Sequence, residues 1–111
     1  MIEKIVFDYL STKFSNVKMT IPKTQPSSFY LIEKTGSTWA NHLTSSVIAI
    51  QSYAPTLYEA AEMNEALKDE MLYGLVAVDS VARVSLNSDG EYTDEETKTP
   101  RYQAVFVITH Y

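Results

Sequence analysis

The last apolar run of the chain limits the fold more than any other segment. Residues 102–110 alternate so that both faces of an extended strand carry apolar side chains, with Tyr102, Ala104, Phe106 and Ile108 on one face and Val105 and Val107 on the other. A strand that is apolar on both faces is typical of the interior of a sheet whose faces are covered. The run therefore predicts a central strand.

Two segments have the spacing of amphipathic helices. The first covers residues 2–14, where apolar side chains recur every three or four positions. The second covers residues 56–73 and begins at Thr56, which can accept from the backbone N–H of Glu59 while Glu59 reaches back, as in a capping box. Gly74 is expected to end this helix in the left-handed conformation.

The remaining β-like runs give the order of elements. They are residues 17–21, 29–34, 43–53 and 81–86, with a turn at Gly36 between the second and the third. The order α-β-β-β-α-β-β predicts an α+β fold, with a mainly antiparallel or mixed sheet of about five strands and two helices packed on one face. A chain of 111 residues is expected to form a single domain, 1–111.

Residues 87–100 form the longest connection and hold five of the 14 acidic residues and one of the nine basic ones. Loops of this length are usually functional or disordered. We therefore predict a long mobile acidic loop at about 88–100, which becomes ordered when cations of a partner offset its charge.

The residue inventory offers little for catalysis. No cysteine is present, so disulfides, thiolate metal sites and a cysteine nucleophile are excluded. The net charge of −5 argues against nucleic-acid binding, and no apolar run has the roughly 20 residues of a membrane span. His42 and His110 are the only side chains with an ordinary pKa near neutrality. We predict no catalytic, cofactor or metal site.

Residues 85–96 partly match the pattern of a calcium-binding loop. With Ser85 as the first position, Asn87, Asp89, Gly90 and Glu96 fall at the third, fifth, sixth and twelfth positions of a helix–loop–helix calcium loop. The first position should be Asp, and strands rather than helices flank the segment. Ordinary hairpin-turn chemistry explains the pattern better.

Aromatic residues point to a contact surface instead. The chain has eight Tyr, and Tyr and Trp are enriched at protein interfaces. Two helices on one sheet face cannot cover every apolar strand residue, so part of the sheet should meet either these aromatic side chains or another subunit. The expected interface residues are Tyr30, Ile32, Asp89, Glu91, Tyr92, Asp94, Glu95, Glu96, Arg101 and Tyr111.

Four segments carry a family resemblance. They are residues 49–54 (Ala-Ile-Gln-Ser-Tyr-Ala), 57–65 (Leu-Tyr-Glu-Ala-Ala-Glu-Met-Asn-Glu), 92–94 (Tyr-Thr-Asp) and 101–106 (Arg-Tyr-Gln-Ala-Val-Phe). In them the chain resembles small tail-terminator, tail-completion or head–tail joining proteins of long-tailed bacteriophages and prophages of Gram-positive bacteria.

The resemblance implies a structural role without catalysis. Proteins of this class assemble as rings, commonly of six subunits, cap the finished tail tube and join it to the head. The expected partners are other copies of the chain, the tail tube protein and the head–tail connector proteins. The expected location is the virion, assembled in the cytoplasm of the bacterial host.

Two other functions stay open at this point. A small intracellular interaction module, such as an inhibitor or adaptor, would suit an acidic surface. A small hydrolase or metal-binding enzyme would need His42, His110 and an acidic side chain to converge in one pocket.

Overall fold

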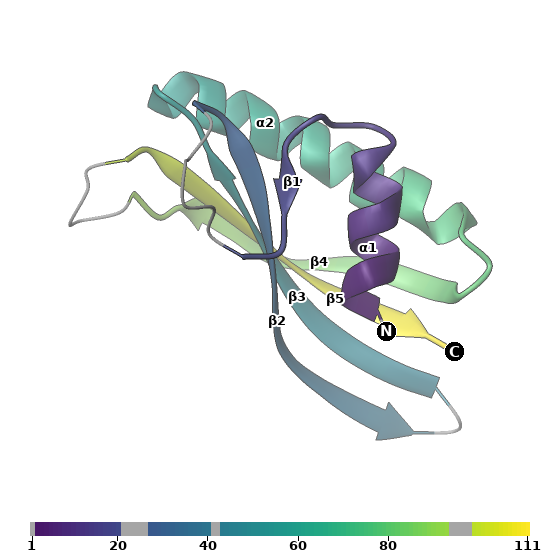
Figure 1. Cartoon of the computed structure of the whole chain (residues 1–111). Helices are drawn as coiled ribbons and strands as arrows, with labels where there is room; N and C mark the ends of the chain where they lie inside the picture. The colour runs from purple at the N-terminus through teal and green to yellow at the C-terminus, as the bar shows by residue number, and fades with distance from the viewer. Residues whose placement is uncertain (1, 21–26, 41–42, 94–98) are drawn as a thin grey trace.

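The computed structural model describes residues 2–20, 27–40, 43–93 and 99–111, with only the backbone of 39 and 40. Its elements follow the predicted order (Figure 1). They are α1 (Ile2–Ser11), β1 (Val17–Lys18), β2 (Phe29–Ala40), β3 (Leu43–Tyr53), α2 (Leu57–Asp69), a π-helical turn η1 (Glu70–Gly74), a 3-10 turn η2 (Leu75–Ala77), β4 (Val81–Glu91) and β5 (Arg101–His110).

One mixed sheet contains all five strands in the order β1-β2-β3-β5-β4. The short β1 runs parallel to β2, and every other pairing is antiparallel. Val107 of β5 lies opposite Val47 of β3 on one side and Ser85 of β4 on the other, so β5 is an interior strand. The predictions of a central last strand and of a five-stranded α+β fold are therefore confirmed.

Both helices lie on the same side of the sheet (Figure 1), and the main core forms between them and the strands. Alternate residues of each strand point into this core because successive side chains of a strand point to opposite faces. Its buried members include Val6, Leu10, Ile32, Ile48, Ile50, Leu67, Met71, Phe106 and Ile108. Within the part of the chain that the structure describes, no helix is long and apolar enough to cross a membrane.

Two strands are longer than their apolar patterns indicate. The sequence predicts a strand at 29–34 and a turn at Gly36, but β2 continues to Ala40 past a bulge between Lys34 and Gly36. Likewise β4 continues beyond Leu86, past a second bulge, to Glu91. The β2 extension is rich in Thr and Ser, and the β4 extension holds Asn, Ser and Asp, so neither shows an apolar alternation. Pairing with β3 holds the first extended, and pairing with β5 holds the second.

The predicted left-handed end of the second helix is wrong. Gly74 has φ −101° and ψ −50°, so the chain stays right-handed there and continues into η2. The glycine is needed for packing instead, because a Cβ at Gly74 would lie 1.9 Å from the Oη of Tyr9. Tyr9 Oη donates a hydrogen bond of 3.1 Å to Glu70, which ties α1 to η1.

The first helix is also shorter than predicted. It ends at Ser11 rather than residue 14, because the N–H groups of Thr12 and Lys13 bond to carbonyls three residues back. Phe14 still packs against the core, with its ring centroid 4.7 Å from that of Tyr30. At the other helix one half of the predicted capping box is present, since the N–H of Glu59 donates to Thr56 Oγ1 at 3.2 Å; no return bond from the Glu59 side chain to the Thr56 N–H is found among the described residues.

Candidate functional site

The structure corrects the expected place of two interface residues. Tyr30 and Ile32 are 5% and 3% exposed and belong to the core beneath the helices rather than to a free edge. Tyr30 Oη donates to the carbonyl of Met63 on α2 at 3.0 Å, so the ring fastens the helix to the sheet. Burial raises the pKa of Tyr30 to about 12. The sequence shows that these residues are apolar but not which face of β2 the helices cover.

Asp89 and Glu91 also differ from their expected setting, because both lie in β4 and not in a loop. Asp89 accepts from Lys68 Nζ at 2.9 Å and from Asn64 Nδ2 at 3.1 Å, both on α2. The Lys68 hydrogen bond lowers the pKa of the Asp89 carboxyl, and Asp89 raises that of Lys68. Asn64 is 1% exposed, so this carboxylate satisfies a buried donor. Asp89 therefore connects the edge strand to the helix layer.

The metal interpretation of the same segment has no support in the geometry. Ser85 and Asp89 are strand residues, and the Asp89 carboxylate is already bound by Lys68. Glu96 lies outside the described residues. Among the described residues, no group of three or more His, Asp or Glu side chains is placed to hold a metal ion.

Tyr92 and Arg101 meet beside the end of β4 and the start of β5. Arg101 Nε donates to the carbonyl of Tyr92 at 2.6 Å, and its Nη1 donates to Tyr53 Oη at 3.0 Å. The ring of Tyr53 stacks on Phe29 at 4.5 Å. Arg101 therefore ties the end of β3 to the residue that follows β4, whereas Asp94, Glu95 and Glu96 lie outside the described residues.

Of the two histidines, only His110 belongs to the described residues. His110 Nε2 lies 2.8 Å from Ser46 Oγ across the β3–β5 pair. His42 lies outside the described residues. Tyr111 follows His110 and is 76% exposed, with its N–H bonded to the carbonyl of Ser80. Its side chain is thus exposed, and its place in an interface stays a prediction.

The face of the sheet opposite the helices carries a half-buried apolar area. Its centre is Val107, which points away from the helices because its neighbours Phe106 and Ile108 point into the core. We call the sheet patch the residues around it on this face: Val47, Val105, Val107, Ser85 and Arg83. The sequence predicts surplus apolar surface, but the register is needed to identify these residues.

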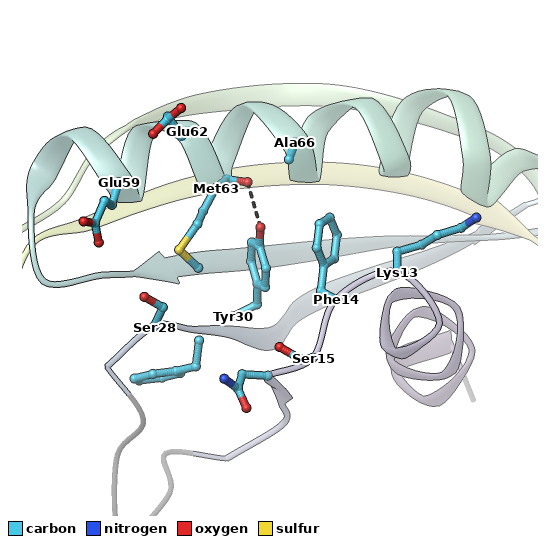
Figure 2. Close-up of a pocket in the computed structure, with 11 residues that line it drawn as sticks. Lys13, Phe14, Ser15, Ser28, Tyr30, Glu59, Glu62, Met63 and Ala66 are labelled. Atoms are coloured by element: carbon cyan, nitrogen blue, oxygen red, sulfur yellow. Dashed lines mark hydrogen bonds between the residues drawn. The ribbon is translucent and has the colours of Figure 1, made fainter.

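A groove of about 580 Å³ lies between α2 and the segment that follows α1. Figure 2 shows Glu59, Glu62 and Met63 on the α2 side, with Phe14 and Tyr30 facing them. The floor is aromatic and the α2 rim is acidic, which is the chemistry of a site for an apolar side chain next to a cation. No sequence motif indicates this groove, because its walls come from segments far apart in the chain.

The candidate site thus consists of surfaces for contact: the sheet patch, the groove beside α2 and the exposed tyrosines. No family model matches the sequence, and no curated protein matches it significantly.

Proposed function

We propose that this chain is a structural protein of virion assembly, which caps the tail tube of a long-tailed phage as an oligomeric ring and joins the tail to the head. The observation that carries the proposal is the sheet patch. The helices cover one sheet face only, and the other presents half-buried valines on adjacent strands. Apolar surface of this kind is typical of protein contact sites.

A ring subunit needs separate surfaces for its two neighbours, because a closed ring is built from heterologous contacts. The fold offers such surfaces on opposite sides, with the sheet patch on one and the outer side of α2 on the other (Figure 1). The exposed tyrosines Tyr58, Tyr73, Tyr92 and Tyr111 add aromatic contact area. The resemblance to tail-terminator and head–tail joining proteins supplies the identity of the assembly.

Deletion of the gene in the parent phage or prophage tests the proposal. Without a cap, tail tubes should grow to irregular lengths and should not join heads, as seen by electron microscopy of induced lysates. A plasmid copy of the wild-type chain should restore joined particles. Joined tails of normal length in the deletion strain would refute the proposal.

A matched pair of variants tests the surface itself. Val107→Lys places a charge in the sheet patch, whereas Val76→Lys places the same charge at an exposed position outside it. Circular dichroism establishes that both chains fold. In the deletion strain, only the Val76→Lys chain should restore joined tails. If both variants restore them equally, the sheet patch is not the surface that tail capping needs.

The groove favours a second candidate function, an interaction module such as an inhibitor or adaptor. Its aromatic floor and acidic rim at Glu59 and Glu62 would take one apolar and cationic segment of a partner. This function predicts a complex with one partner per chain and no ring. An adjacent toxin gene would favour it, whereas genes for a connector and a major tail protein would favour tail capping.

A further inference from the structure

The outer side of α2 carries a regular pattern that the core does not use. Exposed residues recur along α2 and the η1 turn that continues it, and we call them the α2 stripe. They are Tyr58, Glu62, Glu65, Ala66, Asp69 and, in η1, Tyr73; Glu62 and Ala66 also line the groove. The tyrosines at its two ends are 73% and 77% exposed. Three carboxylates lie between them. That of Glu65 is paired with Lys68 Nζ at 2.9 Å, so the stripe has its net negative charge at Glu62 and Asp69, between aromatic ends.

The sheet patch has the opposite character. Arg83 is exposed on this face of β4, and no acidic side chain belongs to the patch. The rest of the patch is mainly valine, with Val47 and Val107 directly paired. A surface with a cation and valines complements one with carboxylates and tyrosine rings.

We propose that the α2 stripe of one copy docks on the sheet patch of the next copy. The occupant is a second copy because the chain itself carries the complementary charges, and because the two surfaces lie on opposite sides of the fold. Such a contact is heterologous, so it can repeat from copy to copy, and it forms a ring where the rotation between copies closes. This inference rests on the proposed function for its biological setting, but it concerns self-association alone.

The contact should be weak between free subunits. α2 has 13 residues and is therefore about 20 Å long. The outer side of one such helix covers less than the roughly 800 Å² per partner of a stable complex. We expect association at high protein concentration and low salt, and its loss when salt screens the charges.

Charge reversal tests the pairing. Arg83→Glu, and separately Asp69→Arg, should weaken self-association about tenfold in sedimentation velocity, because each places like charges together. Combining both in one chain should restore it. Lys34→Glu, an equal change of charge outside both surfaces, is the control for Arg83→Glu and should leave association unchanged.

Engineered cysteines test the geometry, since the chain has none of its own. Ala66→Cys marks the α2 stripe and Val107→Cys marks the sheet patch. A mixture of the two variants under mild oxidation should form a disulfide-linked heterodimer, whereas each variant alone should stay uncrosslinked.

Every outcome decides the inference. Crosslinking within Ala66→Cys alone would show a symmetric contact and overturn it. A protein that stays monomeric at low salt, or that associates equally well after both charge reversals, would also overturn it. These results leave tail capping to its own test, since a ring could form on the tube through other surfaces, and heterodimers without capping activity would refute only the proposed function.

Discussion

The close approach of Gly74 to Tyr9 gives a sharp prediction about stability. Replacing a helical glycine by alanine ordinarily stabilises a helix by about 1 kcal/mol, because alanine loses less backbone entropy. At Gly74 we expect the opposite. A Cβ there would lie 1.9 Å from Tyr9 Oη and 2.9 Å from the ring carbon that bears it.

The size of the stability loss follows from the movement that Tyr9 must make. To reach ordinary contact, the Tyr9 hydroxyl has to shift by about 1.5 Å, since nonbonded carbon and oxygen atoms rarely approach closer than about 3.4 Å. That shift breaks its hydrogen bond to Glu70, which costs about 1 kcal/mol at this partly buried site. Tyr9 is only partly buried, so its ring can swing outward, and the remaining overpacking costs about 1 kcal/mol, the low end of the range for a packed site. After subtracting the helix gain of about 1 kcal/mol, Gly74→Ala should destabilise the fold by about 1 kcal/mol.

Urea unfolding of four chains measures this effect: wild type, Gly74→Ala, Tyr9→Ala and the double variant. In the Tyr9→Ala background the obstacle is gone, so Gly74→Ala should be neutral or stabilising by up to about 1 kcal/mol. Because each kcal/mol is worth about 4 °C at this chain length, thermal unfolding should show the same pattern. A Gly74→Ala chain as stable as wild type, or an equal cost in both backgrounds, would refute the packing explanation.

Three further predictions concern the residues that connect the helices to the sheet. Asp89→Ala should destabilise the fold by about 1–3 kcal/mol in urea unfolding, because the buried Nδ2 of Asn64 loses its acceptor and Lys68 keeps only its ion pair with Glu65. Asp89→Asn should cost less. Burial favours the neutral phenol of Tyr30 and raises its pKa to about 12. The stability that Tyr30 contributes is therefore complete below about pH 10, the pKa of tyrosine in the unfolded chain, and declines as the pH rises toward 12. Thermal unfolding should show a smaller alkaline loss of stability for Tyr30→Phe than for wild type. Thr56→Ala should lower the free energy of unfolding by about 0.5–2 kcal/mol, since the first turn of α2 loses its side-chain acceptor, whereas Thr56→Ser should retain most of it.

The predictability of this fold depends on how apolar each element is. β5 and the start of α2 could be predicted because their patterns are strong: an apolar run on both faces, and Thr56 three residues before Glu59. The polar ends of β2 and β4 could not, since serine and threonine give no alternation, and only pairing with β3 and β5 makes them strands. The packing role of Gly74 could not be predicted from the sequence either, because it depends on contact with Tyr9, 65 positions away in the chain.

The candidate surfaces show the same division. Composition indicates that apolar and aromatic residues exceed what two helices can cover, and the sheet patch fits that expectation. The sequence nevertheless assigns Tyr30 and Ile32 to the interface, because period two places them on one face of a strand without saying which face the helices take. The helical spacing of the α2 stripe is visible in the sequence. That Arg83 lies on the other side of the fold from this stripe follows only from the order of the strands in the sheet.

Direct observation of the chain on tail tubes tests the central claim best. Purified chain carrying a single biotin–gold label at an added C-terminal cysteine should be mixed with tail tubes from the deletion strain and viewed by negative-stain electron microscopy. Tail capping predicts gold at one end of each tube, with a ring density there, and tubes that no longer elongate when tube protein is added. Gold that is absent from the tubes, or that is spread along their length, would contradict the claim.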